Sequence, residues 1–353
     1  MVLIPWITAA YTPVATSFAV EILDRGVVCA DAGAGGYQAF PDVVRLADGD
    51  LLCVFYAGYD HISFPRESLP KGARVCACRS RDDGRTWEPP TIVADTPWDD
   101  RDPSIVQLAD GTIICNWFTY THGQEKHRQG NDVNYKEIYL AFSHDGGATW
   151  GEPRLIESTA NDHFACSSPI RVLSDGTLLM PVYHELLDPL RCTSFVIRST
   201  DGGANWSTPT PVDAANPDND EPDLIELPGG RLLCAMRTNA GAETMMWQSY
   251  SDDMGLSWTS SAPMAFTGHA PYLFRTSRGA LLCAHRVPGT SLHVSGDDGA
   301  TWGENVVIDT CIGAYQSMCE LPDGTVLMVY YEEGPGSRIL WARLDVRPAE
   351  APE

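Results

Sequence analysis

The sequence has few basic residues and almost no lysine. Its 353 residues include 24 Lys and Arg against 47 Asp and Glu, which gives a formal net charge of −23, and the lysines are Lys71, Lys126 and Lys136. Proteins that bind nucleic acid present a basic face to the phosphates. We therefore expect no nucleic-acid partner. The acidity by itself predicts a well-solvated surface and identifies no substrate.

Long apolar runs are also missing. A membrane-spanning helix needs about 18 or more consecutive apolar residues, and no such stretch occurs, so no membrane association is predicted. The first 20 residues carry no charged side chain, but they lack a basic start and are interrupted by Pro5 and Pro13. We expect residues 1–20 to be irregular and not to be a secretory signal.

The cysteines do not form a disulfide or metal pattern. There are eleven, an odd number, and no second pair at zinc spacing accompanies Cys76 and Cys78. No glycine-rich phosphate loop occurs either, so neither a metal nor a cofactor is predicted. Six Cys or Met residues follow an apolar pair at the same point of a repeat, which is typical of a buried packing position: Cys53, Cys115, Cys234, Cys283, Met180 and Met328. We predict reduced thiols and a cytoplasmic location, with secretion as the alternative.

What the sequence does contain is a repeated turn, Ser-x-Asp-x-Gly-x-(Thr/Ser/Asn)-Trp. The Asp carboxylate is suited to accept backbone N–H groups within a tight hairpin turn, the Gly to adopt a positive φ, and the Trp to cover the turn. Five copies exclude chance. They lie at Ser80–Trp87, Ser143–Trp150, Ser199–Trp206, Ser251–Trp258 and Ser295–Trp302.

A second motif, an apolar residue followed by a turn glycine and two more apolar residues, predicts strand, turn and strand. It occurs six times, at Gly49, Gly111, Gly176, Gly230, Gly279 and Gly324. Each unit is too small to bury its faces alone, so we predict that six units stack in a ring. The fold is predicted to be all-β, a single six-bladed β-propeller over residues 1–353. Its last blade, near Arg338–Val346, lacks the Asp turn, and Thr121–Tyr135 is predicted to be a surface loop on blade 2.

These Asp turns are identified as Asp boxes, the repeats of bacterial neuraminidases, and the chain resembles the sialidase superfamily over nearly its whole length. The resemblance implies a six-bladed β-propeller of sialidase type. In that family the Asp boxes lie on the rim, away from the active site. Function must therefore be argued from other residues.

The repeat register locates a candidate site, because equivalent positions in a propeller fall on one ring. Nine residues before the turn glycines lie Phe40, Asp102, Ser167, Glu221, Ala270 and Tyr315. Seven residues after them lie Tyr56, Phe118, Tyr183, Arg237, Arg286 and Tyr331. Charged residues are unusual at such positions, which favours a site at the centre of the ring.

Three segments resemble sialidase active-site segments. Asp220–Leu227, continuing to Arg237, is similar to the segment that carries the family's Glu and Arg. Ala314–Ser317 is similar to the segment of the nucleophilic Tyr, and His285-Arg286 falls near the third family Arg. The resemblance implies that Tyr315 is the nucleophile, Glu221 its base, and Arg237 and Arg286 the ligands of a substrate carboxylate.

These residue types suit a sugar whose anomeric carbon bears a carboxylate. An anionic nucleophile is repelled there, whereas a neutral Tyr is not, and sialidases are the glycosidases with a Tyr nucleophile. A phenol with a pKa of about 10 needs a neighbouring base, and Arg binds carboxylates through paired N–H donors. The structural alternatives are a strand-end charge for Glu221, a packed aromatic for Tyr315 and ion-pair partners for the two arginines.

Blade 1 departs from the family pattern. The family has an Arg-Ile-Pro segment where this chain has Ala39-Phe40-Pro41, so the first Arg is missing. The family's general acid aligns with Tyr56. Leaving-group protonation therefore needs another donor.

Blade 2 offers replacements. Asp102 shares the ring position of Glu221 and Tyr315, and Arg101 lies at the register position of the missing Arg, one blade along. We predict that Asp102 is the acid/base and that Arg101 assists binding, with Asp60 as the second candidate acid and an acidic turn as the structural alternative. Further predicted substrate contacts are Asp60, His61, His269 and Tyr56.

The sequence thus predicts an exo-acting glycoside hydrolase of sialidase type that cleaves a terminal acidic, sialic-acid-like sugar of a glycan with retention. One alternative is a glycosidase or polysaccharide lyase acting on a different sugar. Another is a non-catalytic carbohydrate-binding propeller. The oligomeric state is not indicated by the sequence.

Overall fold

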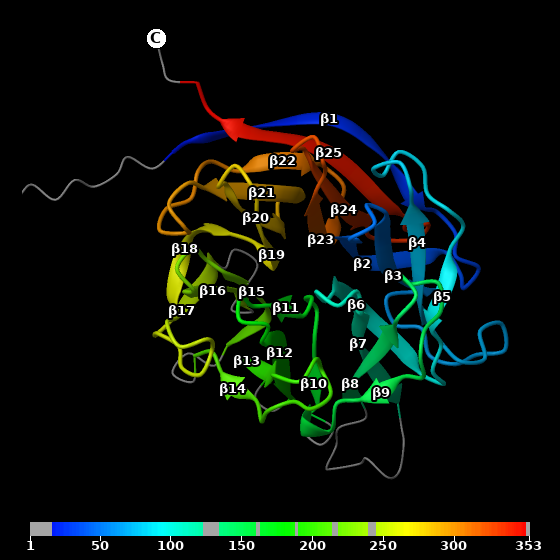
Figure 1. The fold of residues 1–353 in the computed structure, drawn as a ribbon. Helices are drawn as coiled ribbons and strands as arrows, with labels where there is room; N and C mark the ends of the chain where they lie inside the picture. The colour runs from blue at the N-terminus through cyan, green and yellow to red at the C-terminus, as the bar shows by residue number, and fades with distance from the viewer. Residues whose placement is uncertain are drawn as a thin grey trace, which may run out of the picture.

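Six β-sheets are arranged in a ring around a central axis (Figure 1). The computed structural model describes residues 16–122, 134–159, 163–187, 190–213, 218–238 and 245–350. Besides strands, this part of the chain contains the short 3₁₀ helix η2 (Glu157–Thr159) and no helix that is long and apolar enough to cross a membrane. The prediction of an all-β, six-bladed propeller is confirmed. The expected blade-2 loop lies mostly outside the described residues.

The strands of each blade follow one another from the axis to the rim. Blade 1 contains β2 (Tyr37–Arg45), β3 (Leu51–Gly58), β4 (Arg74–Ser80) and β5 (Thr91–Ala94). Blade 2 contains β6 (Asp99–Gln107), β7 (Ile113–His122), β8 (Asn134–Ser143) and β9 (Arg154–Leu155). Blade 3 contains β10 (Phe164–Ala165), β11 (Arg171–Val172), β12 (Leu178–Leu187), β13 (Leu190–Ser199) and β14 (Thr210–Pro211).

The remaining blades complete the ring. Blade 4 contains β15 (Asn219–Glu226), β16 (Leu232–Thr238), β17 (Met245–Ser251) and β18 (Ala262–Thr267). Blade 5 contains β19 (His269–Arg275), β20 (Leu281–Arg286), β21 (Thr290–Ser295) and β22 (Val306–Asp309). Blade 6 contains β23 (Gly313–Glu320), β24 (Val326–Glu332), β25 (Ile339–Pro348) and β1 (Phe18–Cys29).

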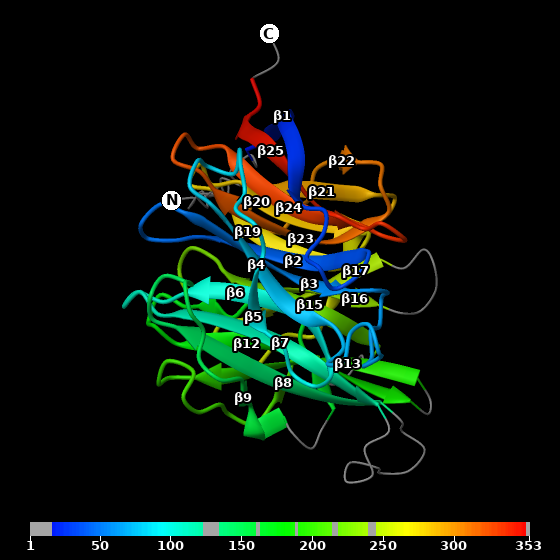
Figure 2. The same cartoon turned by 90° about the vertical axis from the view of Figure 1, so that its right-hand side faces the viewer.

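Pairing of β1 with β25 closes the ring. The two strands are antiparallel from Phe18↔Pro348 to Cys29↔Ile339 and lie side by side at the outer edge (Figures 1 and 2). The outer strand of blade 6 therefore comes from the other end of the chain, and no hairpin precedes it, which explains the missing sixth Asp box. Residues 18–20 belong to a strand, so their predicted irregularity was wrong; residues 1–15 lie outside the described part.

The Asp boxes have the predicted hydrogen bonds. In the first box the Asp82 Oδ1 accepts from the Thr86 N–H at 2.8 Å and from the Ser80 hydroxyl at 2.9 Å. The Ser80 hydroxyl in turn accepts from the Gly84 N–H at 2.9 Å, and Gly84 has a φ of 82°. The other four boxes repeat this arrangement, so each carboxylate holds the turn between the third and fourth strands of its blade.

Each box also accepts a hydrogen bond from the preceding blade. A carbonyl of the turn binds an arginine in four boxes and the Gln248 amide in the remaining one. The donor and acceptor pairs are Arg343→Asp83, Arg79→Gly146, Arg154→Ala204, Arg198→Met254 and Gln248→Gly299. The boxes therefore join neighbouring blades at the rim.

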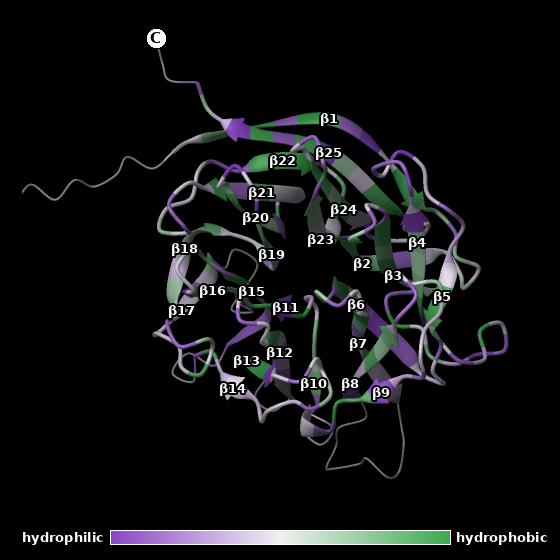
Figure 3. Cartoon of the chain, in the orientation of Figure 1, coloured by the Kyte–Doolittle hydropathy of each residue, from purple (hydrophilic) through white to green (hydrophobic). Residues whose placement is uncertain are grey.

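Apolar side chains fill the sheets and the spaces between them. β1 and β25 alternate between hydrophilic and hydrophobic residues, as expected for strands with one face on the core (Figure 3). The six predicted Cys and Met packing positions are fully buried. All eleven cysteines are free thiols in the structure, and ten of them are buried. The cytoplasmic location stays a prediction.

The innermost strand has the same irregularity in five blades. One extra residue interrupts its pairing with the second strand, as where Asp220↔Arg237 is followed by Asp223↔Ala235. Such a bulge bends the strand and redirects a side chain. The bulged residues have positive φ values of 45–55°: Phe40, Asp102, Glu221, Ala270 and Tyr315. These are five of the six inner-ring positions identified in the sequence.

Two buried aspartates, each two residues after a bulge position, connect the blades close to the axis. Asp223 pairs with Arg171 of blade 3 and accepts the Leu273 N–H of blade 5 at 2.6 Å. Asp42 accepts the Ile105 N–H of blade 2 at 2.7 Å and the Ser317 hydroxyl of blade 6. Because both carboxylates bridge different blades, they stabilise the ring and not a single sheet.

Replacing Asp223 with alanine is expected to lower the free energy of unfolding by about 3–5 kcal/mol, since it leaves the half-buried Arg171 charge without its partner. The matched control is Asp252→Ala, whose exposed carboxylate pairs with Arg231 at 3.3 Å and whose loss costs about 0–1 kcal/mol. Urea denaturation followed by tryptophan fluorescence measures both. Equal losses would contradict the proposed role of Asp223.

Candidate active site

The bulged residues of the inner strands surround the axis of the propeller. They and the residues that follow them line an axial cavity formed by all six blades. A second pocket is formed by residues of blades 1 and 2 together with residues of the inner ring. It is lined by His61, Ile62, Arg101, Asp102, Phe118, Tyr120, Lys136, Tyr183, Glu221 and Tyr315. The six inner-ring residues predicted from the register therefore line the axial cavity, and three of them, Asp102, Glu221 and Tyr315, also line the second pocket.

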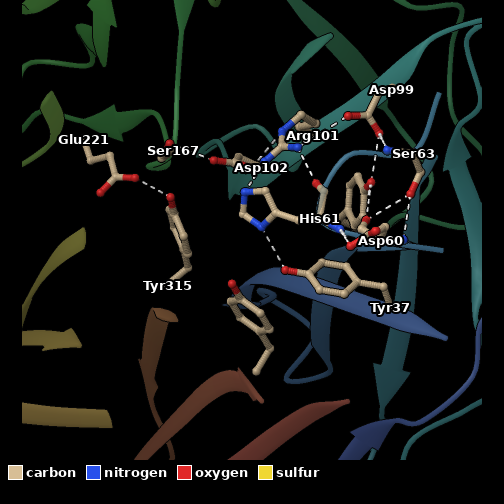
Figure 4. A network of polar contacts seen from close by, with 12 residues as sticks. Tyr37, Asp60, His61, Ser63, Asp99, Arg101, Asp102, Ser167, Glu221 and Tyr315 are labelled. Carbon is tan, nitrogen blue, oxygen red and sulfur yellow. Dashed lines mark hydrogen bonds and ion pairs between the residues drawn. The ribbon is translucent and has the colours of Figure 1, made fainter. Parts of the chain in front are cut away.

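Two residues that line this pocket, Tyr315 and Glu221, are connected to the Arg237 guanidinium, which lies behind Glu221 and does not line the pocket. The Tyr315 hydroxyl donates a short hydrogen bond to Glu221 Oε1 (Figure 4). Glu221 Oε2 accepts from Arg237 Nη1 at 2.9 Å. Tyr315 comes from blade 6, whereas Glu221 and Arg237 come from facing strands of blade 4. The structure thus brings these three predicted residues into direct contact.

Arg286 of blade 5 lies beside this group. Its guanidinium carbon is 5.9 Å from the centroid of the Tyr315 ring. Its Nε atom is buried and has no hydrogen-bond partner within the described residues, and the same is true of Arg237 Nε. Arg237 Nε lies 3.8 Å from Asp220 Oδ1. The two guanidinium groups therefore place positive charge at the edge of the Tyr315–Glu221 pair, which suits an anionic ligand group.

The pKa values of Glu221 and Tyr315 are shifted in opposite directions. Burial raises the pKa of Glu221, but Arg237, Arg286 and the Tyr315 hydroxyl outweigh it and hold the pKa below the ordinary Glu value. Burial and the Glu221 charge raise the pKa of Tyr315 well above 10. The resting site thus holds an ionised carboxylate next to a neutral phenol. This is the starting state for a base that accepts a phenolic proton.

Asp102 faces the same pair from blade 2. Burial, assisted by the Glu221 and Asp99 charges, raises its pKa to about 7, although Arg101 and the Ser167 hydroxyl act in the opposite direction. Its Oδ2 accepts from Ser167 Oγ at 2.9 Å. Its Oδ1 is buried without a hydrogen-bond partner among the described residues, 3.9 Å from Arg101 Nε. A carboxyl group with this pKa can both donate and accept a proton near neutral pH.

The guanidinium of Arg101 extends from blade 2 over the side chains of blade 1. It lies 5.2 Å from the Phe40 ring centroid and 5.8 Å from that of Tyr56. It also pairs with Asp99 at 3.4 Å and donates to the His61 carbonyl. Arg101 therefore places a positive charge near blade 1, where the predicted family Arg is missing, but much of its hydrogen-bonding capacity is used within the protein.

His61 continues this network toward blade 6 (Figure 4). Its Nε2 lies 3.2 Å from Arg101 Nη2, and its Nδ1 lies 3.0 Å from the Tyr37 hydroxyl. Arginine only donates, so Nε2 is the acceptor and Nδ1 carries the proton. The Tyr37 hydroxyl then donates to Glu333 at 2.8 Å. Burial and the Arg101 charge lower the pKa of His61, which keeps it neutral.

The other predicted contacts differ in position. Tyr56 is fully buried and donates to Asp99 at 2.9 Å, so it does not reach the pocket and its predicted substrate contact was wrong. Asp60 is exposed, does not line the pocket, and accepts the His61 N–H at 2.8 Å. His269 is half-buried next to Arg286 in the ladder, and burial with the Arg237 and Arg286 charges lowers its pKa.

Comparisons with known proteins agree with this geometry. The family model described as a BNR repeat-like domain matches residues 79–345. A Bacteroides fragilis sialidase is 29% identical over 258 residues, covering 66% of this chain and 45% of its own, and a Micromonospora viridifaciens sialidase is 27% identical over 350 residues, covering 87% and 52%. The chain belongs to the sialidase superfamily. It spans about half the length of these two relatives.

Among solved structures, a protein of unknown function from Dyadobacter fermentans superposes with a TM-score of 0.79. It is 22% identical and covers 93% of this chain and 99% of its own. This likeness shows the shared propeller fold. For this member of the sialidase superfamily, the chemistry must come from its own site residues.

Several residues that line the pocket of this superfamily member, or that bind its lining residues, were not singled out in the sequence. Ser167 and Tyr183 occupy the two inner-ring positions of blade 3, so the register pointed to them, but their residue types gave no chemical signal. Tyr37, Glu333 and Lys136 lie outside both rings. Only the three-dimensional contacts between blades identify them.

The network around His61 predicts its tautomer. In ¹⁵N NMR spectra His61 is expected to be the Nδ1–H tautomer, with a pKa below 6.5, because Arg101 occupies Nε2. The variant Tyr37→Phe removes the acceptor of Nδ1–H and should weaken this preference. Tyr330→Phe, which loses a hydrogen bond to Asp309 elsewhere, should not. An Nε2–H tautomer in the unmodified protein would contradict the assignment.

Proposed function

We propose that this protein is an exo-acting glycoside hydrolase that removes a terminal acidic, sialic-acid-like sugar with retention of configuration. The observation that carries the proposal is the Tyr315 hydroxyl bound to Glu221, itself bound to Arg237, with the partly unpaired Arg286 beside them. The sialidase relatives support a glycosidase-type propeller. The sugar and the mechanism are inferred from the residues.

The first step would transfer the sugar to Tyr315. Arg237 and Arg286 bind the carboxylate of the sugar and fix its anomeric carbon over the phenol. The phenolic oxygen forms a bond to that carbon while Glu221 accepts the phenolic proton. The bond to the leaving-group oxygen breaks, and this oxygen takes the proton of Asp102.

The second step would release the sugar. Asp102, now ionised, accepts a proton from a water molecule, whose oxygen attacks the anomeric carbon. The bond to Tyr315 breaks and Glu221 returns the proton to the phenolic oxygen. Both steps reuse the same residues, so the acid of the first step is the base of the second.

The electrostatics of the site support these roles. A neutral phenol approaches a carboxylate-bearing carbon without repulsion, and an ionised Glu221 is ready to accept its proton. Asp102, with a pKa of about 7, retains a proton in a large fraction of molecules at neutral pH. The Arg101 charge contributes to the field around the sugar, although Asp99 and His61 hold its guanidinium.

Removing the phenolic oxygen tests the proposal directly. Tyr315→Phe is expected to lower kcat/KM by at least about 10³-fold, since the nucleophile is lost. Tyr330→Phe, which loses a buried hydroxyl bonded to Asp309, is the matched control and should keep its activity. Release of the aryl group is measured with a panel of aryl α-sialosides and other acidic aryl glycosides.

Other products from this panel would point to the alternative functions. An unsaturated sugar absorbing in the ultraviolet would indicate a lyase. Binding of an acidic sugar without any product, in correctly folded protein, would indicate a carbohydrate-binding propeller. Either result would overturn the hydrolase proposal.

The pH profile tests the general acid. Burial raises the pKa of Asp102 to about 7, so the protonated, active form is lost as the pH rises through this value, and kcat/KM should fall on the alkaline side. Asp102→Asn should abolish this limb and lower activity by about 10²–10⁴-fold, least for aryl groups that leave readily. Asp60→Asn should retain the limb. The reverse result would make Asp60 the acid.

A further inference from the structure

Two hydroxyl groups of blade 3 approach Asp102 from the side opposite Arg101. Ser167 Oγ lies 2.9 Å from Asp102 Oδ2 and 3.3 Å from the Tyr183 hydroxyl. Asp102 and Tyr183 are buried and Ser167 is half-buried. The mechanism proposed above uses neither hydroxyl, and both residues occupy inner-ring positions.

The local structure of blade 3 places Ser167 there. In the other blades the inner strand is continuous through its bulge, whereas in blade 3 it is divided into β10 and β11, with residues 166–170 between them. Tyr183 lies on the neighbouring strand β12, paired with Ala165. The interruption lets the Ser167 side chain approach a carboxylate of the preceding blade.

The number of protons on each group determines which atom donates and which accepts in these contacts when Asp102 is ionised. A serine hydroxyl has one proton, and an ionised carboxylate only accepts, so Ser167 donates to Asp102 Oδ2. Ser167 Oγ is then an acceptor toward the Tyr183 hydroxyl. Oδ1 is the oxygen without a hydrogen-bond partner among the described residues, and a proton on Oδ1 leaves the bond from Ser167 to Oδ2 in place.

We propose that Tyr183 and Ser167 are positioning residues, which hold the Asp102 proton on Oδ1 by occupying Oδ2. The relay runs from the Tyr183 hydroxyl through Ser167 Oγ to Asp102 Oδ2. It stabilises the ionised carboxylate after proton donation and leaves one oxygen free for the leaving group and, later, for water. This inference rests on the proposed function for its catalytic meaning, but the relay itself can be measured without substrate.

Other groups around Asp102 also affect its titration and must stay constant in the test. Burial raises its pKa, Arg101 and Ser167 lower it, and Glu221 and Asp99 raise it. Further titratable groups share its pocket or interact with it. Among the described residues these groups are Arg101 and Asp99 on its own strand, Tyr120 on β7, Lys136 on β8, His61 of blade 1, Cys166 and Tyr183 of blade 3, Glu221 of blade 4 and Tyr315 of blade 6.

The experiment measures the pKa of Asp102 in the full chain. The protein is labelled with ¹³C-aspartate, and the carboxyl stretch that is absent from Asp102→Asn is followed by infrared titration. In Ser167→Ala the pKa should rise by about one unit, because one hydrogen bond to the ionised form is lost. Ser167→Thr should restore the original value, and Tyr183→Phe should give a smaller rise, since Ser167 is then less polarised.

Ser168→Ala is the matched control. Ser168 is the neighbouring serine, and its hydroxyl donates to the Pro222 carbonyl at 2.9 Å and not to Asp102. Its removal should leave the pKa of Asp102 unchanged. An unchanged pKa in both Ser167→Ala and Tyr183→Phe, or an equal rise in Ser168→Ala, would overturn the relay. If Ser167→Ala does not fold, Tyr183→Phe decides by the same criterion.

A kinetic arm separates this inference from the proposed function. With an active aryl glycoside, Ser167→Ala should move the alkaline limb of kcat/KM upward by the same unit and lower kcat while KM changes little. A limb that stays in place while the infrared pKa moves would show that Asp102 is not the catalytic acid and would overturn its assigned role. Absence of turnover with every glycoside would count against the proposed function, while the infrared result would still decide the relay.

Discussion

The site depends on one backbone conformation, the positive φ that recurs where the inner strands bulge. Five blades place a residue other than glycine in this conformation, including Asp102, Glu221 and Tyr315. L-residues adopt it at a cost of about 1–2 kcal/mol each. Hydrogen bonds made just after the bulge offset this cost, above all those that buried Asp42 and Asp223 accept from neighbouring blades. In these five blades the bulge brings one side chain to the axis.

Carboxylates that converge on one buried axis are costly to ionise, and arginines beside them offset part of this cost. Glu221 remains ionised although it is buried, because Arg237 and Arg286 lie beside it. Asp102 has Arg101 nearby, but Arg101 is shared with Asp99, so burial and the Glu221 charge prevail and raise the pKa of Asp102. Two carboxyl groups in equivalent ring positions therefore acquire different proton affinities, which is the condition for a base and an acid in one site.

The features that could be predicted from the sequence are those that follow from the position of each residue within its repeat. Turn glycines set a register, and register determines which residues reach the axis, so the convergence of Glu221, Tyr315, Arg237 and Arg286 could be predicted before any contact was known. Contacts between blades do not follow from the repeat. The contact of Arg101 with His61 and that of Tyr37 with Glu333 depend on how far a side chain reaches from one blade to the next. Tyr56 was assigned to the site because its position is equivalent to that of Arg237, but its ring turns into the core and its hydroxyl bonds to Asp99.

The central claim is that Tyr315 forms a covalent bond to the sugar, and trapping that bond tests it most directly. An acidic glycosyl fluoride with a second fluorine next to the anomeric carbon slows the release step more than the loss of fluoride, so the intermediate accumulates. Peptide mapping by mass spectrometry after rapid acid quenching should find the sugar on the phenolic oxygen of Tyr315. Attachment to a carboxylate side chain, or turnover without any adduct and with inverted product, would contradict the account.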